Sequence, residues 1–233
     1  MISALSCAVR CFGWCLLFSF GLTVAATRAA DRPSSLLPFA VAINSAQEVR
    51  IGSGIYLGKG WVLTASHVVG NRWQVPLVSI AGKRLPARIM KQEPFEASDL
   101  TLLAIDDHDL APEIRTLRID LCKTPPTPGE RVISVTPEQE VATEILSPIW
   151  LPQDARKFDT LIKDVASTGN SGSGIFDADA QCLLGIVSRK ISQSFQPPAG
   201  SGQQPVIFDL AKYFVPAARI AEFIPAGLLE TSP

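Results

Sequence analysis

The sequence predicts an all-β fold, either a barrel or a sandwich of short strands. Short apolar stretches recur along the chain, and clusters of turn residues separate them. The 18 prolines and 16 glycines are spread over the 233 residues, which favours many turns over long helices. With 47% hydrophobic and 18% charged residues, the chain has the composition of a globular protein with a sizeable core.

The first half of the chain contains two hairpin signals. Gly58, Lys59 and Gly60 separate two apolar stretches, which is typical of a tight turn between paired strands. A second hairpin is expected across Ala81–Lys83. The strands predicted for this half are 38–43, 55–57, 61–64, 75–80, 85–90 and 99–105.

A charged, proline-bearing stretch, 106–129, connects this half to a second half of the same style. The strands predicted there are 131–135, 141–146, 174–179, 182–188 and 213–215. Residues 192–205 are polar and predict a flexible loop. The final stretch, 216–224, begins with proline and continues with helix formers, which predicts a terminal helix. Spacing alone reveals no internal repeat.

The N-terminal segment, residues 1–29, has the pattern of a secretory signal peptide. Arg10 precedes the apolar run 11–26, and small residues follow, so cleavage is expected after Ala26 or Ala29. The alternative is an uncleaved membrane anchor, although the run is shorter than the roughly 20 residues that a spanning helix needs. We therefore expect a periplasmic or secreted protein, with a short pro-segment near 27–37 left open.

The mature chain retains two of the five cysteines, Cys122 and Cys182. In an oxidising compartment such a pair is a disulfide candidate, and two free, partly buried thiols are the alternative. No Cys-x-x-Cys motif or histidine cluster accompanies them, so no metal site is expected. The formal net charge of −1 and the lack of a long basic run argue against nucleic acid as a partner.

Three residue types that serine acyl transfer requires occur in suitable settings. The chain has two histidines. His67 follows an apolar strand, whereas His108 lies in a charged loop and is interpreted as a surface residue. A neutral imidazole such as His67 can accept the proton of a serine hydroxyl. Asp99 opens a buried strand, where a carboxylate could orient that imidazole. Asp106, Asp107 and Asp109 lie beyond this strand and are expected to be solvated.

The candidate nucleophile is Ser171, within the sequence Thr-Gly-Asn-Ser-Gly-Ser-Gly. Glycines allow a sharp turn, which could present the hydroxyl and direct the backbone N–H groups of Gly169 and Ser171 at a developing oxyanion. Ser173 is a second candidate. A plain loop is the structural alternative, and a phosphate-binding loop is disfavoured because no Lys-Ser/Thr pair follows.

These three segments, TASHVV, SDLTLLAID and GNSGSGIFD, resemble the His, Asp and Ser motifs of the chymotrypsin-fold serine proteases, in the same order. The resemblance covers roughly residues 38–224. It favours the bacterial branch that includes the high-temperature-requirement proteases and the glutamyl endopeptidases. It implies two packed, six-stranded, antiparallel Greek-key β-barrels with a C-terminal helix. The first barrel, 38–118, would carry His67 and Asp99, and the second, 119–233, would carry Ser171.

The same resemblance implies a substrate pocket, for which the candidates are Val165, Ser188, Arg189 and Lys190. The two cations could favour acidic substrate residues or could simply be solvated. Asn170 stands where animal trypsins have Asp, so activation by insertion of a new N-terminus is not expected. Only about ten residues follow Phe223, so we expect no PDZ domain after the protease domain.

The predicted function is that of a secreted or periplasmic serine endopeptidase that cleaves protein or peptide substrates through an acyl-enzyme on Ser171. No metal or cofactor is implied, and the membrane is a partner only if the leader is retained. An inactive peptide-binding protein of the same fold is one alternative. A serine esterase is another, but Ser173 stands where the G-x-S-x-G pattern needs its second glycine. The oligomeric state stays open.

Overall fold

The computed structural model describes residues 35–44, 50–70, 75–163, 170–197 and 204–229. All of them belong to one compact unit that begins at Pro33. The expected leader, 1–29, lies outside the described residues. No helix within the described ranges is long and apolar enough to span a membrane.

The first barrel contains six antiparallel strands that close on themselves in the order β1-β2-β3-β6-β5-β4. The strands are β1 (Ala40–Asn44), β2 (Arg50–Gly58), β3 (Trp61–Ala65), β4 (Leu77–Ile80), β5 (Lys83–Gln92) and β6 (Leu100–Ile105). A 3₁₀ turn, Leu37–Phe39, precedes the barrel, and the one-turn helix α1 (Ser66–Val69) follows β3. Both predicted hairpins are present, as the pairings of β2 with β3 and of β4 with β5 show.

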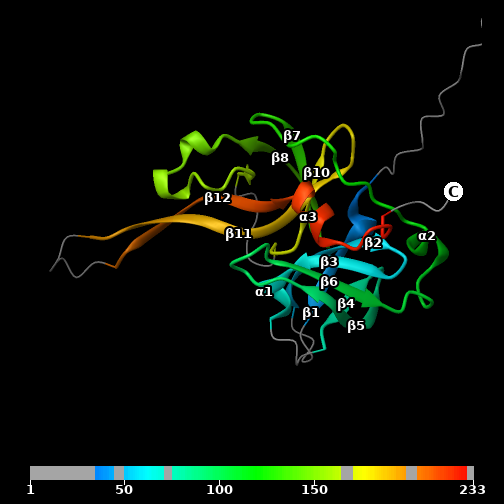
Figure 1. Ribbon diagram of the computed structural model, residues 1–233. Coiled ribbons are helices and arrows are strands. Elements are labelled where there is room, and N and C mark those ends of the chain that lie inside the picture. Colours follow the sequence, from blue (N-terminus) through cyan, green and yellow to red (C-terminus); the bar gives the residue numbers. More distant parts are fainter. Residues whose placement is uncertain (1–34, 45–49, 71–74, 164–169, 198–203, 230–233) are drawn as a thin grey trace, which may run out of the picture. The chain divides into compact units, whose positions relative to one another are not determined.

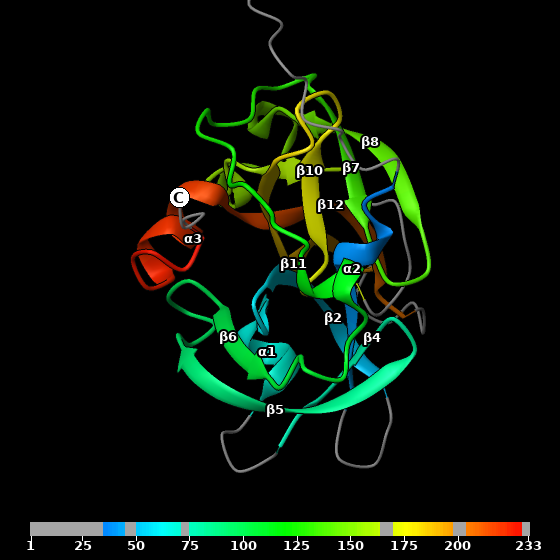
Figure 2. The ribbon, with the colours of Figure 1, turned by 90° about the vertical axis from the view of Figure 1, so that its right-hand side faces the viewer.

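The second barrel closes in the corresponding order, β7-β8-β9-β12-β11-β10 read around the ring (Figures 1 and 2). The strands are β7 (Arg131–Val135), β8 (Glu140–Leu146), β9 (Leu161–Ile162), β10 (Gly174–Asp177), β11 (Leu183–Phe195) and β12 (Val206–Pro216). Two 3₁₀ turns, Pro148–Trp150 and Gln153–Ala155, lie between β8 and β9. Helix α2 (Pro112–Arg115) lies in the connection between the barrels, and α3 (Ala217–Phe223) ends the fold. The predicted fold class is confirmed.

Each barrel encloses its own apolar interior, and a third apolar cluster joins the two. Val41, Val62 and Leu103 represent the first interior, and all three are fully buried. The joining cluster includes Leu100 of the first barrel and Ile186 of the second, again without exposed surface. Burial of apolar surface therefore holds the barrels against each other and fixes how their loops meet.

The hairpin of β11 and β12 is longer than the sequence predicted. Residues 192–205 were expected to form a polar loop, but β11 continues to Phe195 and β12 begins at Val206. Backbone pairing from Ser192↔Asp209 to Phe195↔Val206 explains the extension, because cross-strand hydrogen bonds do not require apolar side chains. Figure 1 shows this hairpin projecting from the second barrel.

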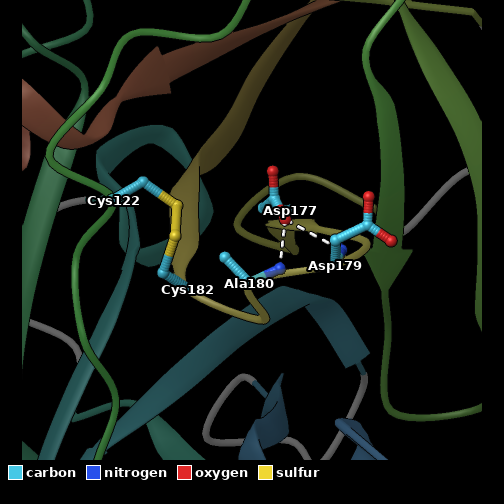
Figure 3. Close-up of a disulfide and its surroundings, with 5 residues drawn as sticks. All are labelled: Cys122, Asp177, Asp179, Ala180 and Cys182. Atoms are coloured by element: carbon cyan, nitrogen blue, oxygen red, sulfur yellow. Dashed lines mark hydrogen bonds between the residues drawn. A yellow bond between two sulfur atoms is a disulfide. The ribbon is translucent and has the colours of Figure 1, made fainter.

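A disulfide joins Cys122, in the connection between the barrels, to Cys182, which directly precedes β11 (Figure 3). The Cys122 N–H also donates to the Leu183 carbonyl at 3.0 Å. The turn before Cys182 is ordered by Asp177, whose Oδ1 accepts from the N–H groups of Asp179, at 2.8 Å, and Ala180. The inter-barrel connection is thus attached covalently to the strand that leads into the candidate site.

Candidate active site

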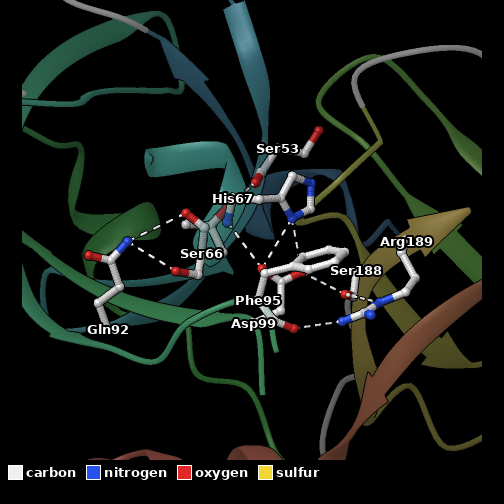
Figure 4. Close-up of polar contacts among 9 residues, drawn as sticks. Ser53, Ser66, His67, Gln92, Phe95, Asp99, Ser188 and Arg189 are labelled. Carbon is white, nitrogen blue, oxygen red and sulfur yellow. Dashed lines mark hydrogen bonds and ion pairs between the residues drawn. The ribbon is translucent and has the colours of Figure 1, made fainter. Parts of the chain in front are cut away.

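Asp99 and His67 form a hydrogen-bonded pair at the end of the first barrel (Figure 4). His67 Nδ1 lies 2.9 Å from Asp99 Oδ2 and 3.1 Å from Oδ1. The His67 backbone N–H also donates to Oδ1, at 3.1 Å. The Asp99 side chain is completely buried, whereas 34% of the His67 side chain is exposed. A buried carboxylate on Nδ1 orients the ring and leaves Nε2 for a substrate or nucleophile.

The local backbone explains why the imidazole faces outward. Ser66, Val68 and Val69 of α1 are buried, so His67 is the residue of this turn that remains accessible. Gln92 of β5 fixes the turn, because its amide donates to Ser66 Oγ and to the Gly70 carbonyl, both at 3.0 Å.

Asp99 adopts a left-handed backbone conformation, with φ of 55°. Aspartate tolerates this region better than bulky residues do. Its backbone is held on both sides: the Asp99 N–H donates to the Pro94 carbonyl at 3.1 Å, and its carbonyl accepts from Ser66 N–H at 3.0 Å. Backbone and side chain of Asp99 therefore both anchor α1.

Ser188 supplies another donor to the same carboxylate. Its hydroxyl donates to Asp99 Oδ2 at 2.6 Å, and Ser188 is 1% exposed. Ser188 is expected from the sequence at the edge of a substrate pocket, and its side chain points at Asp99. Hydrogen bonding to the ionised form stabilises a buried carboxylate, so Ser188 of β11 supports the charge that orients His67.

Ser171 lies in a turn that reaches across to the first barrel. The Ser53 N–H of β2 donates to the Ser171 carbonyl at 2.8 Å. Gly172 follows with φ of 85°, and a Cβ there would lie 1.9 Å from the Ser53 carbonyl oxygen. The close approach of two backbones therefore requires glycine at this position.

Gly52 places this turn beside α1. A Cβ on Gly52 would lie 2.6 Å from Val68 Cγ1 and 3.0 Å from the Ser171 carbonyl oxygen. Val68 follows His67 directly, so the Ser171 turn and the histidine helix flank the same glycine. Among the described residues, the hydrogen bonds of the His67 ring are those to Asp99. A hydrogen bond between His67 and the Ser171 hydroxyl is therefore part of the mechanism proposed below.

Burial distinguishes the two candidate nucleophiles. Ser173 has no exposed surface, and its hydroxyl has no hydrogen-bond partner among the described residues. Ser171 is partly exposed at the start of the turn. A nucleophile has to reach a substrate carbonyl, so this difference favours Ser171. The other expected oxyanion donor, Gly169, and the pocket candidate Val165 lie outside the described residues.

The adjacent cations Arg189 and Lys190 have different surroundings. The Arg189 guanidinium lies 3.8 Å from the centre of the Phe95 ring and donates to the Phe95 carbonyl at 2.8 Å. Figure 4 shows the Phe95 ring between this guanidinium and the imidazole of His67, which it meets edge-on at 5.7 Å. Lys190 instead pairs with Asp209 at 2.7 Å and thereby lowers the pKa of that carboxyl group.

Phe95 is a site residue that sequence reasoning missed. It lies in the loop before Asp99 and has no local motif that would single it out. Two further rings approach the same guanidinium, those of Phe158 at 5.5 Å and Tyr213 at 5.8 Å. Burial raises the pKa of Tyr213 above its usual value. Arg189 is thus stacked beside the candidate base by aromatic side chains from distant segments.

One group of described residues has the donor set of a cation site. Ligand atoms of Asp106, Asp107 and His108 lie within 4.8 Å of one another. Asp107 already accepts a hydrogen bond from the Tyr56 hydroxyl at 3.0 Å, and its neighbours in the group are exposed. This arrangement belongs to the loop after β6, and it assigns no metal to the His67 site.

Comparisons with known proteins identify the family of the chain. The trypsin-like peptidase domain model matches residues 52–186, more than half of the chain and a range that includes His67, Asp99 and Ser171. No curated protein matches the sequence.

Solved structures share the fold at low identity. The Rv3671c protease of M. tuberculosis, in its active form, is 19% identical with a TM-score of 0.55, over 85% of this chain and 84% of that chain. The MamO protease domain of Magnetospirillum magneticum is 19% identical with a TM-score of 0.56, over 82% and 98%. Mouse neuropsin, a serine protease, is 17% identical with a TM-score of 0.55, over 80% and 92%. By its family model and its fold, the chain belongs to the trypsin-like peptidase family and is a serine endopeptidase by class.

Proposed function

We propose that the mature chain is a secreted or periplasmic serine endopeptidase in which Ser171, His67 and Asp99 act together. The observation that carries this proposal is the buried Asp99, which binds His67 Nδ1 at 2.9 Å while the Ser171 turn is hydrogen-bonded to β2 beside the histidine helix. Base, orienting carboxylate and accessible hydroxyl thus come from loops at the contact between the two barrels.

The proposed reaction proceeds in two stages. Ser171 Oγ attacks a peptide carbonyl carbon while His67 Nε2 takes the hydroxyl proton, and backbone N–H groups near Ser171 stabilise the oxyanion. His67 then gives this proton to the leaving amine, the C–N bond breaks, and an ester on Ser171 remains. A water molecule, deprotonated by His67, attacks the ester and releases the acid product and the free hydroxyl.

The leader and the cysteines support the location. A signal-like segment precedes the mature chain, and the disulfide between Cys122 and Cys182 is typical of an oxidising compartment. N-terminal sequencing of the protein from periplasmic and culture fractions tests this part. A new N-terminus after Ala26 or Ala29 supports it, and an intact Met1 in the membrane fraction contradicts it.

A fluorophosphonate probe tests the mechanism. We expect the mature protein to be labelled and Ser171→Ala to lose the label, while the matched variant Ser173→Ala keeps it if it folds. Absence of labelling of the mature protein, with folding verified by circular dichroism, would instead favour an inactive peptide-binding protein. Hydrolysis of simple esters without any cleavage of a peptide library would favour an esterase.

A further inference from the structure

The outer half of the β11–β12 hairpin is an exposed apolar surface. Phe195, Val206 and Phe208 are 52%, 53% and 52% exposed. The pairs Gln193↔Phe208 and Phe195↔Val206 are two positions apart, so these three apolar side chains project from one face of the hairpin. The rings of Phe195 and Phe208 meet edge-on at 5.4 Å on that face.

The same part of the chain carries no charge. From Ile191 to Phe208 the sequence contains no Asp, Glu, Lys or Arg, and the flanking charges Lys190 and Asp209 pair with each other. A projecting hairpin normally carries charged side chains that keep it in water and block edge-to-edge pairing. An uncharged face of exposed aromatic and aliphatic residues is instead typical of a binding surface.

Strand β11 connects this surface directly to the candidate active site. It carries Ser188, which bonds to Asp99, and continues to Phe195, with shifts in its pairing register at Val187/Arg189 and Ile191/Ser192. Its pairing with β10 ends at Ile186, and from Ile191 to Phe195 the described structure pairs it with β12 alone. That part of β11 therefore presents a sheet edge to which an extended chain can add.

We propose that this surface, β11 from Ile191 to Phe195 together with Val206 and Phe208, binds an extended, apolar segment of the polypeptide substrate. The proposal rests on the endopeptidase function proposed above and names a distal part of its substrate site. A chain that joins this edge in the antiparallel sense in which β11 pairs with β10 and β12 runs from Phe195 toward Ser188. It therefore reaches the site with the residues that precede the cleaved bond.

The length of the strand sets the expected substrate length. From Ser188 to Phe195 an extended strand covers about 23 Å, at roughly 3.3 Å per residue. The apolar segment would thus lie roughly seven residues upstream of those bound at Ser188. Short peptides would not reach it, and unfolded or loosely folded chains would. The substrate class is an extended polypeptide with an apolar stretch upstream of the cut.

A nested set of peptides tests the proposal. The set is built on a cut site found with a peptide library and carries either three or twelve residues upstream, the additional ones being Leu and Val. We expect kcat/KM to rise about tenfold with the upstream extension. An equally long downstream extension should give no such rise. If Ser and Gly replace the additional Leu and Val residues of the peptide, the wild-type enzyme should no longer show the rise in kcat/KM.

The double variant Phe195→Ser/Phe208→Ser should lower the ratio of long-peptide to short-peptide kcat/KM to about one. Met90→Ser, at a residue 53% exposed on β5, is the matched control and should leave the ratio unchanged. A wild-type protein that shows no length gain, or a double variant that keeps it, would overturn the proposal.

Self-association is the competing use of the face. The wild-type protein could form a dimer that the double variant converts to a monomer. If the rise of kcat/KM with peptide length then stays the same, the surface binds a second copy of the chain, and the proposal is overturned. Fluorophosphonate labelling of Ser171 separates the two hypotheses: a labelled enzyme without length gain contradicts only the distal surface, whereas an unlabelled one contradicts the proposed function.

Discussion

The Ser188 hydroxyl donates to Asp99 Oδ2 at 2.6 Å and thereby connects the second barrel to the carboxylate that orients His67. Both residues are almost fully buried, so water does not replace this bond if it is lost. The arrangement of the candidate base therefore depends on a residue of the other barrel.

Ser188→Ala is expected to lower kcat/KM about tenfold or more, because a hydrogen bond to a buried charged group contributes about 1.5–3 kcal/mol. Ser35→Ala is a matched control. Its hydroxyl also donates to a carboxylate, Glu140 Oε1 at 2.7 Å, but at an exposed position outside the proposed substrate site. Steady-state kinetics of both variants decide the matter, and equal small effects would contradict a role of Ser188 in orienting the pair.

Gly172→Ala should both destabilise the fold, by about 3 kcal/mol, and reduce labelling of Ser171, because the new Cβ would overlap the Ser53 carbonyl. Gly129→Ala separates steric overlap from backbone strain. Gly129 has nearly the same φ, 86° against 85°, but nothing lies within 4 Å of its would-be Cβ. It should therefore cost only about 1–2 kcal/mol. Urea unfolding measures both, and equal losses would refute the steric argument.

Arg189→Leu should reduce cleavage of peptides with an acidic residue near the cut, whereas Lys190→Leu should have a smaller effect. The charge of Lys190 pairs with Asp209, but the described polar contacts of Arg189 are to a carbonyl and a hydroxyl, so its charge is available to a substrate carboxylate. A roughly fivefold selective loss is expected. Cleavage of a peptide library by wild type and both variants measures this loss. If the cleavage preference of Arg189→Leu is unchanged, Arg189 has only a structural role, stacked on Phe95.

Removing the disulfide with Cys122→Ala and Cys182→Ala should lower the free energy of unfolding by about 4 kcal/mol, because the bond closes a loop with a sequence separation of 60. Urea denaturation of oxidised protein measures the loss. The free energy of unfolding of the wild-type protein in excess dithiothreitol should equal that of the double variant. If reduction leaves this free energy unchanged, the prediction is wrong.

Stability should also fall at alkaline pH because of Tyr56, which is fully buried in β2. Burial raises its pKa to about 12, and the Gly60 N–H that donates to its oxygen opposes the shift. An unfolded tyrosine ionises near pH 10, so between about pH 10 and 12 the native state binds more protons than the unfolded state. The free energy of unfolding therefore decreases across this window, by about 2–3 kcal/mol. Tyr56→Phe should have a smaller decrease than wild type in the same titration.

The sequence predicted what depends on local pattern. Alternating apolar stretches and turn glycines indicated the strands of both barrels, and flanking patterns singled out His67 and Asp99, which the structure brings into hydrogen-bond contact. Contacts between distant segments could not be read in this way. The stacking of Phe95 on Arg189 depends on how the barrels dock.

Two strands differ from the prediction for physical reasons. The two-residue strand β9 is too short for a periodic signal. The outer part of β11 is held by backbone hydrogen bonds to β12 rather than by apolar alternation, so its polar sequence resembled a loop.

The hydrogen bond from the Ser53 N–H to the Ser171 carbonyl relates the candidate site to the folding of both barrels. The two groups belong to different barrels, so this hydrogen bond requires both barrels to be folded and in contact. A chain in which only one barrel is folded therefore lacks the bond that holds the Ser171 turn against β2. Labelling of Ser171 is therefore expected only in protein whose two barrels are both folded.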